Sequence, residues 1–176
     1  AGGASLFVGN AYQPQMPEFA HDLGQHHDHH AGLFYSLLLS ADGAGAITAA
    51  IVLESRGLLN AHPRSAIVLT ILWCMALAGF AVTTLYPVAL VLMFAAGFLS
   101  LAFYAMAQTL VQLSAPAELR GRIVGLFATS SLGLRAFSGV TVGVVGGLIG
   151  IHWSLAASAM ALLATAIALL ALSMKR

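Results

Sequence analysis

Charged side chains are scarce in this sequence. Asp, Glu, Lys and Arg make up 7% of the 176 residues, whereas hydrophobic residues make up 60%. An ordinary soluble domain carries about 25% charged residues, which it needs to cover its surface. A chain that is solvated by lipid has no such need, so the composition predicts a membrane protein. The net charge of only +1 argues against a nucleic-acid partner.

Cysteine is almost as rare, and no enzyme-like pattern of side chains is present. Cys74 is the only cysteine, so the chain cannot form an internal disulfide bond. The sequence holds no nucleophile–base pattern and no metal-ligand motif within its apolar segments. We therefore do not expect an enzyme.

Long apolar runs dominate what is present. A helix needs about 20 mostly apolar residues to cross the hydrocarbon core, and five runs meet this requirement: 31–53, 65–86, 88–113, 123–149 and 151–174. A weaker run, 2–20, has Asn10, Gln13, Pro14 and Glu18 in its second half, which predicts a polar and kinked span. The sequence therefore predicts an all-α membrane protein with six transmembrane helices, in which residues 1–176 form one domain.

The basic residues fall on alternate connections between these runs. Outside the runs they are Arg56, Arg64, Arg120, Arg122, Lys175 and Arg176. The positive-inside rule assigns this side to the cytoplasm, so both termini are expected there. The histidine-rich connection 21–30 then lies on the extracytoplasmic side.

Two connections also carry a family signature. Pro116-Ala117-Glu118-Leu119-Arg120-Gly121-Arg122 is similar to the loop between helices ten and eleven of drug–proton antiporters in the major facilitator superfamily. The branch that it resembles contains enterobactin and macrolide exporters. Glu54, Arg56 and Arg64 resemble the degenerate second copy of the helix 2–3 loop motif of the superfamily. By this resemblance the six spans are helices seven to twelve, the carboxy-terminal half of the fold.

The resemblance implies half of a secondary active transporter in a bacterial inner (plasma) membrane. Such a protein exports a small amphipathic molecule by alternating access, coupled to protons, and needs no cofactor. It also needs a second six-helix bundle as a partner: the missing amino-terminal half, a second copy of this chain, or other membrane subunits. The alternative is an accessory or structural subunit of a larger membrane complex, without transport activity.

Asp42 and Arg135 are the charged residues near the middle of their apolar runs. A charge at the bilayer centre is costly, so such residues usually pair, face a wet cavity or carry protons. Asp42 is a candidate proton-coupling carboxylate, because a low-dielectric site favours its neutral form. Arg135 is a candidate ligand for an anionic substrate. The competing interpretation is a structural ion pair, and we expect both residues to face a second bundle.

The other polar and glycine residues each allow two interpretations. Glu118, Arg120, Gly121 and Arg122, with Glu54, Arg56 and Arg64, are either a cytoplasmic latch that opens during transport or a topology anchor. Gln108 and Gln112 either line the cavity or bond neighbouring helices. A glycine series is expected to allow close helix packing: Gly139, Gly143, Gly146, Gly147 and Gly150.

Histidine is concentrated in the connection 21–30. The candidate metal ligands are His21, His26, His27, His29 and His30. Imidazole suits Zn²⁺, Ni²⁺ or Cu²⁺, and such close spacing allows a loop to wrap around an ion. The same composition also suits a soluble connection without metal.

Overall fold

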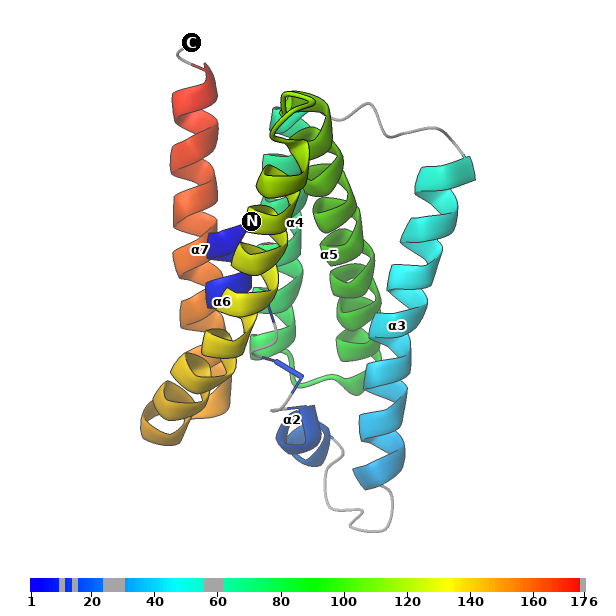
Figure 1. The fold of residues 1–176 in the computed structure, drawn as a ribbon. Coiled ribbons are helices and arrows are strands. Elements are labelled where there is room, and N and C mark those ends of the chain that lie inside the picture. Colours follow the sequence, from blue (N-terminus) through cyan, green and yellow to red (C-terminus); the bar gives the residue numbers. More distant parts are fainter. Residues whose placement is uncertain (10–11, 14–15, 24–30, 56–61, 175–176) are drawn as a thin grey trace.

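The described part of the chain contains helices and no strands (Figure 1). This computed structural model describes residues 1–9, 12–13, 16–23, 31–55 and 62–174. The helices are α1 Gly2–Phe7, α2 Met16–Leu23, α3 Ala31–Ser55, α4 Pro63–Val82, α5 Tyr86–Ser114, α6 Arg120–Ile149 and α7 Ile151–Met174.

Within the described residues, four helices are long and apolar enough to cross a membrane. They are Gly32–Ser55, Pro63–Val82, Tyr86–Ser114 and His152–Leu172. α6 is also long, because 30 residues at 1.5 Å per residue extend about 45 Å. The length and apolar composition of these helices indicate that the chain is an integral membrane protein.

The long helices run alternately up and down, so their connections gather at two ends of the bundle (Figure 1). The ends of α3 and α7 and the starts of α4 and α6 share one end. Glu54, Arg64, Glu118, Arg120 and Arg122 lie at that end and are exposed. The α4–α5 and α6–α7 connections lie at the opposite end and carry no charged side chain.

Proline and glycine set several helix ends. α4 and α5 each have a proline in the first turn, where the missing N–H costs no hydrogen bond. Gly150 separates α6 from α7 with a φ of +89° and a ψ of 149°, which a residue with a Cβ rarely adopts. A glycine at this position is therefore explained by the turn between the two helices.

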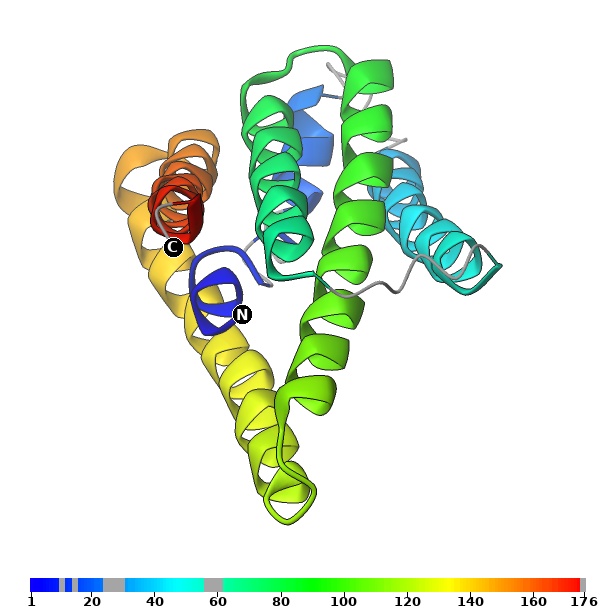
Figure 2. The same cartoon turned by 90° about the horizontal axis from the view of Figure 1, so that it is seen from above.

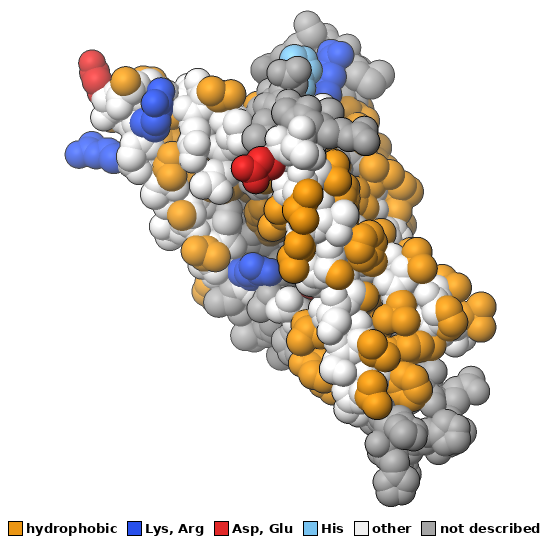
Figure 3. All heavy atoms as spheres, turned by 90° about the vertical axis from the view of Figure 1, so that its right-hand side faces the viewer, with side chains coloured by type: hydrophobic (Ala, Val, Ile, Leu, Met, Phe, Trp, Pro, Cys, Tyr) orange, Lys and Arg blue, Asp and Glu red, His pale blue; other side chains and the backbone are white. Residues whose placement is uncertain are grey.

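The outer surface suits a lipid solvent, whereas large aromatic side chains fill the interior. Hydrophobic side chains cover much of the face on the α3 side (Figure 3). Exposed examples on three helices are Ile47, Val91 and Leu126, each more than 60% exposed. Trp73 and Phe80 of α4 are fully buried. An apolar exterior around an apolar core is expected when lipid surrounds the helices.

α3 packs on α5 at a very close crossing. A Cβ added to Gly97 of α5 would collide with the backbone oxygen of Asp42. A Cβ added to Gly45 of α3 would collide in the same way with the backbone oxygen of Phe94. This mutual contact fixes the depth of Asp42 relative to α5.

The glycines that the sequence predicts for close packing on α6 differ from Gly45 and Gly97 in their surroundings. A Cβ on Gly147 or Gly150 would meet nothing within 4 Å, so these two residues make no close helix contact with the described residues. Gly146 is buried, and its carbonyl accepts a hydrogen bond of 2.8 Å from the Gly150 N–H. The surroundings of Gly139 and Gly143 lie outside what the structure describes, so their packing role stays a prediction.

Candidate functional site

The first apolar run is broken in the middle. α1 has 6 residues and α2 has 8, which at 1.5 Å per residue gives about 9 and 12 Å, too short to span a membrane. Val8 leaves the helix with a φ of −129°. Val8, Gly9, Tyr12 and Gln13 are the described residues of this break, which coincides with the polar half of the run. The N–H groups of Val8 and Gly9 still bond the Ala4 carbonyl at 3.1 and 3.0 Å, but carbonyl groups beyond the end of a helix need other partners.

Arg135 supplies one of these partners from α6. Its Nε donates a hydrogen bond of 2.9 Å to the Gly9 carbonyl. Gly9 is buried, and a Cβ placed on it would lie 3.1 Å from Cγ of Arg135 and 2.6 Å from the Ser5 carbonyl oxygen. The absence of a side chain at Gly9 therefore allows this close approach.

Asp42 approaches the same break from α3. Its carboxylate oxygens lie 3.3 and 3.5 Å from the Tyr12 hydroxyl, which donates to them. The Gln13 side chain is a further hydrogen-bond partner of this carboxylate. Tyr12 is only 3% exposed, so a buried phenol and an amide solvate Asp42.

The two charges predicted from the sequence thus meet at one short segment. No direct ion pair joins Asp42 and Arg135 among the described residues, but Arg135 acts electrostatically on both Asp42 and Tyr12. Both residues contact the α1–α2 break within this chain, so their nearest partners lie inside the bundle. Chemically, the arrangement holds a carboxylate that can exchange a proton beside a fixed positive charge.

α1 is also tied to α5. The hydroxyl groups of Ser5 and Tyr104 are 2.9 Å apart and share a hydrogen bond. The Tyr104 ring makes edge-to-face contacts with the rings of Phe103 and Trp73, whose centroids lie 5.2 and 6.0 Å from the Tyr104 centroid. These contacts fix Tyr104 at the wall of a pocket between α5 and α6.

This α5–α6 pocket has a volume of about 350 Å³ and both polar and apolar lining residues. It is lined by Leu101, Tyr104, Gln108, Val124, Phe127, Ala128, Ser131, Leu132 and Arg135. Ser131 is only 8% exposed, and its Oγ has no hydrogen-bond partner in the described part of the chain. A buried hydroxyl without a partner is costly and indicates a place where a ligand or water binds. Gln112, the other predicted glutamine, is exposed and does not line the pocket.

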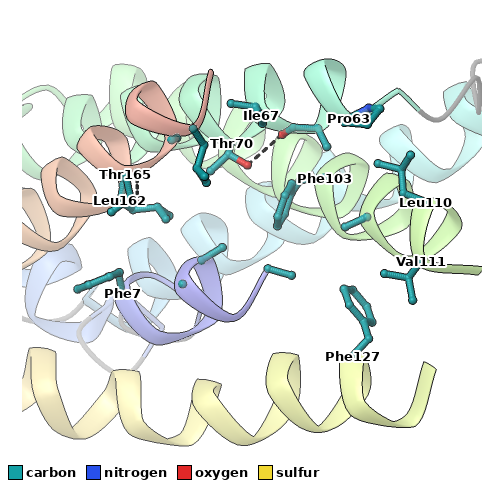
Figure 4. Close-up of a pocket in the computed structure, with 17 residues that line it drawn as sticks. Phe7, Pro63, Ile67, Thr70, Phe103, Leu110, Val111, Phe127, Leu162 and Thr165 are labelled. Carbon is teal, nitrogen blue, oxygen red and sulfur yellow. Dashed lines mark hydrogen bonds between the residues drawn. The ribbon is translucent and has the colours of Figure 1, made fainter. Parts of the chain in front are cut away.

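A larger apolar cavity lies between α1, α4, α5, α6 and α7 (Figure 4). Its volume is about 510 Å³, and Phe7, Phe103 and Phe127 point into it. The hydroxyls of Thr70 and Thr165 bond carbonyls of their own helices at 3.0 and 2.7 Å. Phe127 lines both this cavity and the α5–α6 pocket, so it is the wall between them.

The histidine-rich connection adds little to the described site. His26, His27, His29, His30 and Arg56 lie outside the described residues. His21 lies in α2 and is exposed. In the part that the structure describes, no three His, Cys, Asp or Glu side chains could hold a metal ion together. The metal interpretation of 21–30 stays a prediction.

Sequence reasoning missed another histidine at the opposite end of the bundle from the arginines. His152 Nδ1 lies 2.8 Å from the Ala81 carbonyl oxygen, and its ring packs 4.5 Å from that of Phe19. His152 thereby links α7 to the end of α4 and to α2. Its isolated place in an apolar run gave no signal of this role.

The family model for transmembrane secretion effectors, a group within the major facilitator superfamily, matches residues 16–176. The chain belongs to this family. No curated protein and no solved structure matches the chain. The transmembrane secretion effectors are transporters by family, which agrees with the resemblance read from the loops at 54–64 and 116–122. The match includes Asp42, Arg135 and the α5–α6 pocket, whereas α1 precedes it.

Proposed function

We propose that the chain is the carboxy-terminal six-helix half of a secondary transporter that exports a small amphipathic molecule in exchange for protons. In this proposal α1 and α2 together are the first span, and α3 to α7 are the other five. Alternating access then requires a second six-helix bundle against which this one rocks.

The observation that carries the proposal is the broken first helix, held by a charge on each side. Transporter sites typically lie near the membrane midplane at discontinuous helices, whose free backbone groups face the substrate or ion. Arg135 binds the backbone of the break at Gly9, and Asp42 binds its side chains at Tyr12 and Gln13. A carboxylate at such a depth is a suitable proton carrier.

Replacing Asp42 with asparagine should reduce proton-driven export to the level of cells that lack the protein. Asparagine keeps the size and one acceptor for Tyr12, but it cannot take up a proton. The measurement is efflux of fluorescent amphipathic probes, one anionic and one cationic, from cells that express the whole protein. A protonophore separates the proton-driven part of the efflux.

Tyr12→Phe is the matched control, because it removes the hydrogen bond to Asp42 and leaves the carboxyl able to titrate. This variant should retain proton-driven export. Full activity of the asparagine variant would contradict proton coupling at Asp42. Absence of export of every probe by the wild-type protein would favour the accessory-subunit alternative.

The proposed orientation places the end with Arg64, Arg120 and Arg122 in the cytoplasm of a bacterial cell, by the positive-inside rule. Ser55 and Thr84 lie at opposite ends of the bundle, and both are exposed. In a Cys74→Ala background, a cysteine at position 84 should react with an impermeant maleimide added to intact cells. A cysteine at position 55 should react only after the membrane is opened. Labelling of both positions in intact cells would contradict the topology.

A further inference from the structure

We propose that the α5–α6 pocket binds the substrate, and that this substrate is an amphipathic monoanion with a carboxylate head and a compact apolar body. This proposal extends the proposed function, and it rests on that function for the statement that the bound ligand is the transported substrate. The binding itself is tested separately from transport.

Arg135 and Ser131, four residues apart on α6, line the pocket and suit a carboxylate. Arg135 is held in place by the bond from its Nε to the Gly9 carbonyl. A guanidinium group binds a carboxylate with two parallel hydrogen bonds, so an arginine fixed in this way at the pocket favours this head group. Ser131 lines the same pocket with a buried hydroxyl that has no hydrogen-bond partner among the described residues.

The charge around the pocket points to a single negative charge. Among its lining residues Arg135 is the only charged one, and Gln108 and Tyr104 add neutral polar groups. A cation would face Arg135 without a carboxylate beside it. A second negative charge would lie in the membrane without a partner, which is costly.

The remaining walls define the body of the ligand. Leu101, Val124, Phe127 and Leu132 are apolar and line the same pocket. Ligand pockets usually enclose about 300–1,000 Å³, so a volume of about 350 Å³ favours a compact body. Phe127 separates this space from the larger apolar cavity, where a longer apolar part would extend if the ring rotates.

Calorimetry on the whole protein in lipid nanodiscs tests this site. The probes are 1-naphthaleneacetate, the uncharged 1-naphthaleneethanol and the cationic 1-naphthylmethylammonium, with empty nanodiscs as the blank. We expect the acetate to bind at least about tenfold more tightly than the other two, because only the acetate forms charge-assisted bonds to Arg135.

Variants then locate the binding. Arg135→Gln should weaken binding of the acetate about tenfold or more, and Arg135→Lys should restore part of it, because lysine keeps the charge without the bidentate geometry. Ser131→Ala should weaken it about threefold. Ala128→Phe fills the pocket without changing Arg135 and should prevent binding even if the arginine variants fold poorly. Arg122→Gln, an exposed position on α6 outside the pocket, is the control and should have no effect.

Equal affinity for the three probes, or an unchanged affinity in Ala128→Phe, would overturn the assignment. If dioleoylphosphatidylglycerol in the nanodiscs displaces the acetate and Arg135→Gln removes that competition, the anion is a lipid head group and the substrate assignment fails. Binding of the acetate without any export would support the proposed binding site and contradict the proposed transport function. Export of cationic probes without binding of the acetate would support the transport function and contradict the proposed binding site.

Discussion

Alanine in place of Gly45 or Gly97 should strongly destabilise the protein, whereas alanine in place of Gly43 should stabilise it slightly. Gly43 and Gly45 are two residues apart in α3 and receive the same substitution. A Cβ at Gly45 or Gly97 would collide with backbone oxygen of the partner helix, which cannot rotate away as a side chain can. A Cβ at Gly43 would meet nothing within 4 Å.

The expected sizes follow from these surroundings. Overpacking of a closely packed contact costs about 1–3 kcal/mol and more when the backbone must move. Removing an open glycine from a helix interior gains up to about 1 kcal/mol. For a domain of this size, each kcal/mol changes Tm by about 2–4 °C. We therefore expect Tm to fall by about 6 °C or more for Gly45→Ala and Gly97→Ala, and to rise slightly for Gly43→Ala.

The measurement is thermal unfolding of the purified protein in detergent, followed by tryptophan fluorescence and by size-exclusion profiles after heating. Because Asp42 lies at the crossing of α3 and α5, Gly97→Ala should also displace the carboxylate and reduce export at temperatures where the protein is still folded. Equal Tm values for the Gly43 and Gly45 variants would show that α3 and α5 do not touch at this point.

The sequence predicted the long helices because their apolar runs are continuous and far longer than a buried helix of a soluble protein requires. It also predicted the weak first segment, since Asn10, Gln13, Pro14 and Glu18 interrupt the run that contains the break. Their position in the middle of an apolar run selected Asp42 and Arg135 as candidates, and their functional roles stay predictions. Depth alone did not reveal that both contact the same break, because that depends on how α3 and α6 pack around it.

The close contact of α3 and α5 lies at glycines that the sequence did not single out. Gly147 and Gly150 belong to a regular series that suggested a packing face, and a Cβ on either would meet no described atom within 4 Å. Gly45 and Gly97 are the glycines that permit the contact, and neither belongs to a regular glycine series. Spacing along one helix cannot show which residue of another helix crosses it.

Ser131 was missed for a related reason. A serine or threonine in a helix normally bonds a carbonyl of the preceding turn, as Thr70, Thr165 and Ser138 do at 3.0, 2.7 and 2.8 Å. Nothing in the local sequence distinguishes Ser131 from these residues. Its unpartnered Oγ follows from its burial at the α5–α6 pocket, which is a property of the packed bundle.

Removing both charges at the α1–α2 break should cost less than the sum of removing each alone. Asp42→Asn leaves Arg135 positive beside a neutral break, and Arg135→Gln leaves Asp42 without the positive charge that acts on it. An uncompensated charge inside a membrane protein is strongly destabilising, by about 3–5 kcal/mol when a buried partner is lost. The double variant leaves no charge uncompensated and keeps the Tyr12 contact to the residue at position 42.

The test is a double-mutant cycle on the free energy of unfolding for wild type, Asp42→Asn, Arg135→Gln and the double variant. Residues that act on each other show coupling of about 0.5–3 kcal/mol, and we expect a value within this range. Asp42→Asn with Arg122→Gln is the matched control cycle, since Arg122 is exposed at the start of α6; its effects should add. Strict additivity in the Arg135 cycle would mean that the two charges do not act on each other across the broken helix, and that each is compensated by a separate partner.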